Sequence, residues 1–325
     1  MIRILGNKTD KYVQGFFEYD SKKSGSLTIS HLRLSDNEIL SSYLIKNEDV
    51  ISINNFSFVH RYNCLDGLKN NGKVIINSVF TPDEIDRILP SSYKQILKDK
   101  NAKLYVINGQ KIAKLNGLGE KINIIMEAGL FKILNILTEK EAKKELKKEI
   151  IKAFSKKGKE VVEKNINAMM AAFESVEEVD VEKLTISEEK NKLKHTRGFN
   201  MIVDRIQRLE GNSLPVSSFS KDGSIPTDTA KLEKRGIALE TPVWLPENCI
   251  QCGQCVLACP HGALRAVLID EKDCPKDKNM PFASAFGLAG KKYRIQISPE
   301  DCTGCGVCTK NCPAMKKALE MVLAS

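Results

Sequence analysis

Eight of the ten cysteines in this 325-residue sequence fall into two tight runs near its C-terminal end. Each run reads C-x2-C-x2-C-x3-C-P, a spacing typical of proteins that hold two [4Fe–4S] clusters. Three close cysteines wrap a short loop around one cubic cluster, and the fourth points away and ligates the other cluster. The expected ligands are Cys249, Cys252, Cys255 and Cys312 for the first cluster, and Cys302, Cys305, Cys308 and Cys259 for the second.

The repeat extends beyond the cysteines. Pro246-Glu247-Asn248 precedes the first run, and Pro299-Glu300-Asp301 precedes the second run 53 residues later. Two copies related by a pseudo-twofold axis would bury two clusters back to back. Zinc is the alternative metal, but zinc takes four ligands, usually as two separated pairs, and triplets followed by Cys-Pro fit it poorly. The pattern therefore predicts a ferredoxin-type domain that transfers electrons.

The other two cysteines are isolated and are interpreted as inert. Cys64 lies in a predicted helix, and Cys274 lies in the segment between the two runs. His261 follows the first run and could tune a cluster through a hydrogen bond, although an ordinary exposed histidine is the favoured interpretation. Close regular spacing without a secretion signal favours metal ligation over disulfides.

The N-terminus, MIRILGNKTDKY, contains neither a long apolar stretch nor a small-residue cleavage site. No apolar run is long enough to span a membrane. These two features predict a cytoplasmic protein. Hydrophobic residues make up 42% of the chain and charged residues 28%, which is typical of a globular protein.

The formal charge of +9 treats every cysteine as neutral. Two clusters with their thiolates would add roughly −4, so the balance becomes only mildly basic. The lysines are dispersed over a helical stretch without interleaved aromatic residues that could stack on bases. Nucleic-acid binding therefore ranks below electron transfer. For the lysines themselves, a solvated helix face is favoured over an anion-binding or partner-binding patch.

Residues 1–137 alternate short apolar runs with helical patterns. This alternation predicts an open α/β layered domain with a largely parallel sheet. Thr81-Pro82-Asp83-Glu84 has the pattern of a helix start, with a threonine cap and a proline in the first turn. The predicted strands are Ile2–Leu5, Ser26–Leu34, Val50–Ile53, Lys73–Asn77 and Lys103–Ile107.

A second capping box, Thr138-Glu139-Lys140-Glu141, predicts a long helical region that reaches about Val176 and breaks at Gly158. Its apolar face is predicted to contain Leu146, Ile150, Ile151 and Phe154. Proline, glycine and serine become frequent from Leu214, so residues 214–247 are expected to be irregular. A strand is expected at Lys291–Ile297, before the second cysteine run.

These patterns predict three parts. An α/β domain occupies residues 1–176, and a linker with one helix, at Met201–Leu209, occupies residues 177–213. An α+β ferredoxin-like domain for two [4Fe–4S] clusters occupies residues 214–325.

Several blocks outside the cysteine motif resemble the pyruvate:ferredoxin (flavodoxin) oxidoreductase family, and the match covers nearly the whole chain. The blocks are Leu214–Ser217, Glu233–Ala238, Trp244–Cys252 and Tyr293–Ile297 near the clusters, and Tyr19–Gly25, Ser30–Arg33, Gly117–Gly119 and Ile122–Met126 in the first domain. The resemblance implies a portion of that enzyme, because in the family two domains precede the matched region and a thiamine diphosphate domain with a third cluster follows it.

For the first domain, the resemblance implies a role in handling coenzyme A. Lys22 and Lys23 lie in a Ser/Gly-rich turn that suits phosphate groups. Gly117-Leu118-Gly119 precedes a helix predicted to start at about Lys121, and a helix N-terminus favours anions. Asn123 could hydrogen-bond a pantetheine amide. The alternative is that both segments are ordinary structural turns.

The resemblance thus implies an electron-transfer and coenzyme-A-binding portion of a 2-oxoacid oxidoreductase, with pyruvate as the expected substrate. Electrons would come from a thiamine diphosphate centre on another domain or chain and leave to ferredoxin or flavodoxin. Asp222-Gly223 lacks the downstream partner that thiamine diphosphate needs. An excised piece, a truncated gene product and a subunit of a multi-chain enzyme remain open, as does a stand-alone electron carrier with an accessory domain.

Overall fold

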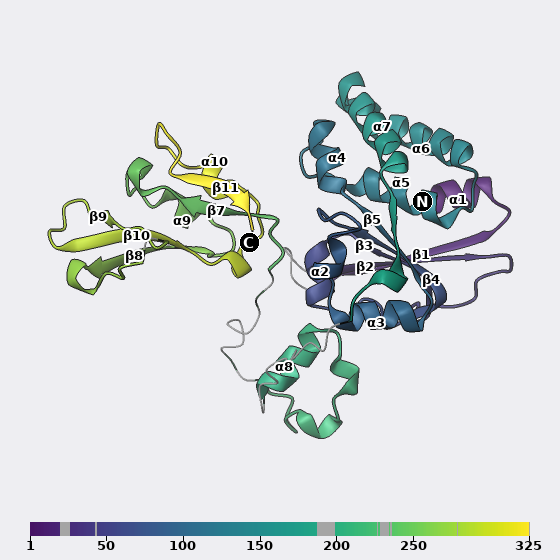
Figure 1. Ribbon diagram of the computed structural model, residues 1–325, viewed down its shortest axis with the longest axis horizontal. Coiled ribbons are helices and arrows are strands. Elements are labelled where there is room, and N and C mark those ends of the chain that lie inside the picture. The colour runs from purple at the N-terminus through teal and green to yellow at the C-terminus, as the bar shows by residue number, and fades with distance from the viewer. Residues whose placement is uncertain are drawn as a thin grey trace. The chain divides into compact units, whose positions relative to one another are not determined.

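The computed structural model describes residues 1–19, 27–42, 44–186, 199–225, 227, 234, 236–277 and 279–324. The chain divides into two compact units (Figure 1). The first contains Met1–Tyr19 and Thr28–Ile225, and the second contains Pro226–Ser325. In the described ranges, no helix combines the length and the apolar character needed to cross a membrane.

A four-stranded sheet forms the centre of the first unit. Its order is β3 (Glu48–Ile53), β4 (Leu68–Asn77), β5 (Lys103–Ile107) and β6 (Glu177–Val179). The first three strands run parallel, and β6 pairs antiparallel with β5. The predicted open α/β fold with a largely parallel sheet is therefore confirmed. Three of the predicted strands, in β3, β4 and β5, are also confirmed.

Alternate residues of the central strands face two separate cores. Ile75 and Ile107 belong to one core, whereas Val74, Ile76 and Leu104 belong to the other. This period of two, with apolar side chains on both faces, is expected of parallel strands covered on both sides. The first core is covered by α1 (Ile2–Lys8), α4 (Gly109–Leu115), α5 (Asn123–Leu134), α6 (Glu139–Phe154) and α7 (Lys159–Glu174). The second is covered by α2 (Ile85–Ile88) and α3 (Ser91–Asp99), with 3-10 turns at Phe56–His60 and Val181–Lys183.

The boundary between α6 and α7 follows the sequence closely. Thr138 and Glu141 form the predicted capping box, in which Thr138 Oγ1 accepts from the Glu141 backbone N–H and the Glu141 carboxylate accepts from the Thr138 backbone N–H. Gly158 separates the two helices with a φ of 98°, a conformation that favours glycine. Leu146 and Ile150 are buried as predicted, but Ile151 is 44% exposed. The predicted apolar face was therefore one residue too wide.

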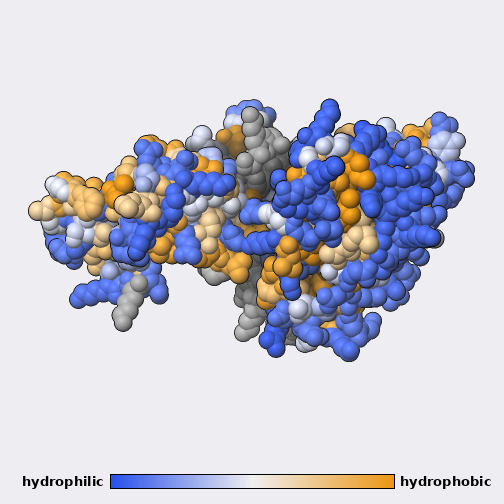
Figure 2. Space-filling model, turned by 90° about the horizontal axis from the view of Figure 1, so that it is seen from above, coloured by the Kyte–Doolittle hydropathy of each residue, from blue (hydrophilic) through white to orange (hydrophobic). Residues whose placement is uncertain are grey.

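Lysines on these helices pair with nearby carboxylates. Lys143 Nζ lies 2.6 Å from Glu139 Oε1, and Lys164 Nζ lies 2.6 Å from Glu160 Oε1. Both are i,i+4 pairs, which are typical of a solvated helix face. Figure 2 shows that hydrophilic residues cover much of the visible surface, with hydrophobic patches between them.

Two local predictions in the first unit were wrong, and one strand was missed. The apolar run Ile2–Leu5 is not a strand but the start of α1, with Leu5 fully buried. Four apolar residues fit a buried helical turn as well as a strand, so periodicity cannot separate them. Cys64 lies in a turn before β4 rather than in a helix. In addition, β1 (Tyr12–Tyr19) was not predicted, and it pairs antiparallel with β2 (Thr28–Ser35), which corresponds to the predicted strand at Ser26–Leu34.

The predicted helix at Met201–Leu209 is confirmed as α8 (Phe199–Gln207), which is followed by 3-10 turns at Gly211–Ser213 and Val216–Ser218. The expectation of an irregular segment over residues 214–247 was partly wrong. Glu240–Trp244 forms β7, which pairs antiparallel with β11 (Leu319–Leu323). The partner strand lies at the far end of the second unit, so the local sequence gives little sign of it.

The second unit contains a further antiparallel sheet of three strands. Its order is β8 (Leu264–Asp270), β10 (Lys291–Ile297) and β9 (Ala283–Ser284), and β10 has the predicted bounds. Two short helices, α9 (Gln254–Ala258) and α10 (Val307–Lys310), lie within the cysteine runs. The core joins Trp244, Tyr293 and Ile295 to several of the cysteines. The predicted α+β character of this part is confirmed.

Candidate metal centre

The two cysteine runs share one local structure. A 3-10 turn precedes each run, at Pro246–Asn248 and Pro299–Asp301. Proline suits the first position of such a turn, because the N–H it lacks would have no intrahelical partner there. Gly253 and Gly306 then adopt left-handed backbones, with φ of 72° and 67°, at the N-caps of α9 and α10. Each of these short helices carries the third cysteine of its run.

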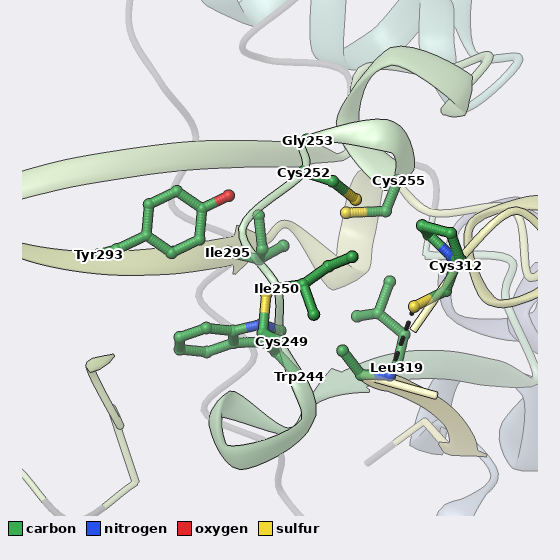
Figure 3. A pocket seen from close by; sticks show the side chains of 12 residues that line it. Trp244, Cys249, Ile250, Cys252, Gly253, Cys255, Tyr293, Ile295, Cys312 and Leu319 are labelled. Carbon is green, nitrogen blue, oxygen red and sulfur yellow. Dashed lines mark hydrogen bonds between the residues drawn. The ribbon is translucent and has the colours of Figure 1, made fainter. Parts of the chain in front are cut away.

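Two cavities gather the eight cysteines in groups of four. The first is the subject of Figure 3, and its cysteines are Cys249, Cys252, Cys255 and Cys312. The second is lined by Cys302, Cys305, Cys308 and Cys259. Each cavity thus takes three cysteines from one run and the fourth from the other.

Backbone N–H groups donate to cysteine sulfurs around both cavities. Gln251 N lies 3.4 Å from Cys249 Sγ, and Gly304 N lies 3.4 Å from Cys302 Sγ. Ala318 N donates to Cys312 Sγ at 3.4 Å, the contact dashed in Figure 3. Such donors stabilise negative charge on sulfur, which suits thiolate ligands.

Burial opposes ionisation of the thiols. Burial is the main cause that raises the pKa of Cys255 to about 11, and the neighbouring Cys249 and Cys252 contribute to this increase. Burial also raises the pKa of Cys302 and Cys308, with additional contributions from the cysteines around them. Four thiolates in one cavity therefore need a compensating positive charge. Iron supplies that charge and binds thiolates, so the donor set fits a cluster of iron and sulfide.

The remaining single residues lie as follows. His261 lines the second cavity and is half-buried. Cys274 ends the 3-10 turn Glu271–Asp273 as a free, half-buried cysteine. The backbone N–H of Cys64 donates to the hydroxyl of Tyr93 at 3.0 Å, and burial raises the pKa of the Cys64 thiol. A partly buried thiol with a raised pKa is a poor nucleophile, which agrees with an inert Cys64.

The residues predicted to contact coenzyme A have different outcomes. Lys22 and Lys23 lie outside the described residues. Asn123 is exposed and is the first residue of α5, two residues after the predicted start. Gly117 and Gly119, just before it, have φ of 67° and 63°.

The start of α5 lies beside the carboxyl edge of the parallel strands. A Cβ added at Gly109, which follows β5, would lie 3.3 Å from Ile122, the residue before Asn123. Gly109 N also donates to Asn77 Oδ1, at the end of β4, at 3.0 Å. Asn77 Nδ2 donates in turn to Asn54 O, after β3, at 2.9 Å. Sequence reasoning missed these asparagines, although each directly follows or ends a strand. Open α/β sheets bind ligands at this edge.

Sequence reasoning also missed three residues at the cysteine cavities. Gln251 has a left-handed backbone with a φ of 55°, and its side chain accepts from Phe286 N and donates to Ser284 O. Trp244 lines the first cavity, and Thr303 lines the second. Trp244 is the only tryptophan in the sequence, which is the one signal that could have singled it out.

The fold and the two four-cysteine cavities define a ferredoxin-type iron–sulfur protein joined to an α/β unit. Three family models match the chain. Pyruvate ferredoxin/flavodoxin oxidoreductase matches residues 1–175, a domain of unknown function matches residues 198–238, and the 4Fe-4S dicluster domain matches residues 248–315. The chain belongs to the pyruvate ferredoxin/flavodoxin oxidoreductase family. Its dicluster domain implies two [4Fe–4S] clusters.

Several curated proteins resemble nearly the whole chain. Pyruvate:ferredoxin oxidoreductase of Moorella thermoacetica is 44% identical over 99% of this chain, and pyruvate-flavodoxin oxidoreductase of Klebsiella pneumoniae is 40% identical over 98%. The chain spans 28% of the length of each of these relatives. Among solved structures, pyruvate oxidoreductase subunit PORC of Thermotoga maritima covers 55% of this chain and 86% of its own, with 22% identity and a TM-score of 0.42.

Proposed function

We propose that this chain is the electron-transfer and coenzyme-A-binding portion of a 2-oxoacid oxidoreductase that acts on pyruvate. Family membership and the relatives' names support pyruvate as the substrate class. In this proposal a thiamine diphosphate centre on another domain or chain is the electron source, and ferredoxin or flavodoxin is the acceptor. The remaining domains or subunits are the partners of the chain, in an oligomeric, cytoplasmic enzyme that binds neither nucleic acid nor membrane.

The observation that carries the electron-transfer role is the crossed grouping of cysteines in the two cavities. We assign Cys249, Cys252, Cys255 and Cys312 as ligands of the first cluster. The second cluster takes Cys302, Cys305, Cys308 and Cys259. When bound, each cluster supplies a one-electron carrier. The residues of the chain hold the irons, shield them with the apolar side chains of the core, and direct backbone N–H groups at the thiolates.

The coenzyme A role rests on the first unit. Asn123 opens α5 beside the carboxyl edge of the parallel strands, a place where open α/β sheets bind ligands. The positive end of a helix of this length also favours phosphate groups. Lys22 and Lys23 would add point charges for those phosphates. We keep the proposed order of an α/β part, a linker and a dicluster part, but the α/β part extends past residue 176, because β6 completes the central sheet and Leu184 is buried in its second core.

Iron and sulfide analysis tests the central assignment. The purified, anaerobically reconstituted chain should contain about eight irons and about eight acid-labile sulfides. Zinc without sulfide would contradict the assignment.

A second experiment tests the proposed partners. Thiamine-binding partners should co-purify with the chain from its native source, and pyruvate turnover should require them. Repeated purification without such partners would favour a stand-alone electron carrier with an accessory domain.

A further inference from the structure

The first cysteine cavity contains a buried hydrogen-bond donor for which the described residues provide no acceptor. Trp244 is only 4% exposed, and its indole Nε1 is fully buried without a partner among the described residues. A buried indole N–H normally finds a partner, because leaving it unpaired costs its desolvation energy. Trp244 also lines the cavity together with Cys249 and Cys255. The missing acceptor is therefore expected within that cavity.

Packing holds the indole in this orientation. Trp244 is the last residue of β7 and pairs with Leu319 of β11. Its ring meets that of Tyr293 edge to face, with 6.2 Å between the centroids and an interplanar angle of 63°. Figure 3 shows the indole beside Cys249, with the nitrogen edge turned toward the other residues of the cavity. The donor is thus oriented in advance toward the space enclosed by the four sulfurs.

The second cavity also contains a buried side-chain donor, but this donor does not occupy the position that corresponds to Trp244 in the repeat. Thr303 Oγ1 is buried without a partner in the described part of the chain, and Thr303 lines the cavity with Cys302 and Cys305. With the repeat of 53 residues, Thr303 corresponds to Ile250, and Trp244 corresponds to Ile297. Among the described residues, each cavity is therefore lined by one buried side-chain donor without a partner. An isoleucine occupies the corresponding position of the other copy in both cases.

We propose that the indole N–H of Trp244 donates a hydrogen bond to a sulfur of the first cluster and raises the reduction potential of that cluster. The Thr303 hydroxyl does the same for the second cluster. A donor stabilises the more negatively charged, reduced state more than the oxidised state. In this proposal Trp244 and Thr303 donate hydrogen bonds directly to cluster sulfurs and are not iron ligands. The inference rests on the ligand sets proposed above.

The test is an EPR-monitored redox titration of the full, cluster-loaded chain. Trp244→Phe keeps an aromatic ring and removes the N–H. We expect about a tenfold smaller equilibrium constant for reduction of the first cluster, or about 59 mV for one electron, with the second cluster unchanged. Thr303→Val is the matched variant and should lower only the second potential, whereas Thr303→Ser should restore it.

A second measurement avoids any substitution. Because the chain has one tryptophan, growth on ¹⁵N-indole-labelled tryptophan places the label only at Trp244. The reduced first cluster should then show a ¹⁵N hyperfine coupling and a coupling to an exchangeable proton that disappears in D₂O. If the cluster is intact but lacks these couplings, or if Trp244→Phe leaves its potential unchanged, the proposed hydrogen bond is contradicted. The proposed function of the chain is not affected by that result. A chain that binds no iron and sulfide would overturn both this inference and the proposed function.

Discussion

Gln251 and Gly304 share a left-handed backbone at corresponding positions of the two cysteine runs, with φ of 55° and 72°. In each case the backbone N–H donates to the cysteine two residues earlier, at 3.4 Å. This conformation is easy for glycine and strained for glutamine. The Gln251 side chain offsets the strain, because Nε2 donates to Ser284 O at 2.7 Å and Oε1 accepts from Phe286 N at 3.0 Å. The first run therefore stabilises its left-handed backbone with the Gln251 side chain, whereas the second run has a glycine at the same position.

The space around the glycines predicts unequal effects of alanine. Gly253 and Gly304 both have a φ of 72°, so alanine costs roughly 1–2 kcal/mol of backbone strain at either position. At Gly304, however, the added Cβ would also lie 3.1 Å from Glu240 O, whereas Gly253 has open space. Gly304→Ala should therefore destabilise the cluster-loaded chain more than Gly253→Ala does. Guanidinium unfolding followed by cluster absorbance measures this, and equal midpoints would contradict the prediction.

The crossed grouping of the cysteines can be tested by iron content. Replacing the four cysteines of one cavity with serine should remove one cluster and leave about four irons per chain. Replacing the four cysteines of one run should instead damage both clusters and leave almost no iron. The first variant changes Cys259, Cys302, Cys305 and Cys308, and the second changes Cys302, Cys305, Cys308 and Cys312. The opposite result, with iron retained only in the second variant, would indicate ligation within each run.

The features predicted correctly from sequence are those encoded by local patterns. The strand at Lys103–Ile107 is a short β-branched and aromatic run, and the start of α6 is encoded by Thr138 and Glu141. The cysteine spacing likewise indicates the dicluster domain that matches residues 248–315, whereas the individual ligand sets remain a prediction. In contrast, the short apolar run at Ile2–Leu5 fits two structures equally well, and only its packing into the core selects the helix.

The features that sequence reasoning missed depend on distant partners. β7 forms because Leu319–Leu323 lies beside Glu240–Trp244, and neither segment indicates the other. The unpartnered indole of Trp244 becomes visible only when the surrounding cavity is known. Burial of Lys94, which is 5% exposed, is equally unexpected, because an isolated lysine in a helix normally faces solvent.

An ion pair between Lys94 and Asp86 predicts a pH-dependent stability of the first unit. Lys94 Nζ lies 2.9 Å from Asp86 Oδ1 and donates to Thr185 O at 2.9 Å. Burial alone would raise the pKa of Asp86, but hydrogen bonds from Lys94 and Thr185 lower it below its ordinary value of 3.8. A lowered carboxyl pKa gives stability that is present above pH 3.8 and lost as the pH falls through the folded-state pKa.

Asp86→Asn should remove this acid-dependent contribution. The variant leaves the buried ammonium of Lys94 without its carboxylate, so we expect a loss of about 3 kcal/mol near neutral pH. The difference from the original chain should shrink as the pH approaches 3. Urea unfolding at several pH values measures both effects. Asp180→Asn is a suitable control, because the Asp180–Lys183 pair is exposed to solvent and is expected to contribute little to stability at any pH. A constant difference between Asp86→Asn and the original chain at all pH values would contradict the prediction.

The coenzyme A proposal makes a separate prediction at Asn123. Aspartate at the first position of α5 would interact favourably with the helix dipole, so Asn123→Asp should preserve or slightly raise stability. The same negative charge would repel the phosphates of coenzyme A, and we expect roughly tenfold weaker binding, or about 1.4 kcal/mol. Calorimetric titration with coenzyme A measures the affinity, and thermal unfolding measures the stability of the same variant.

A control variant distinguishes the effect of the added charge on coenzyme A affinity from the effect of losing the amide hydrogen bond. Asn123→Gln keeps an amide and adds no charge, so its affinity should remain within about threefold of the original chain. Lys22→Gln combined with Lys23→Gln removes two positive charges and should weaken binding with a reduced dependence on salt, since fewer ionic contacts remain to be screened. Unchanged affinity in Asn123→Asp would place coenzyme A away from the start of α5. Unchanged affinity in both this variant and the double-lysine variant would remove the residue basis for coenzyme A binding by this unit.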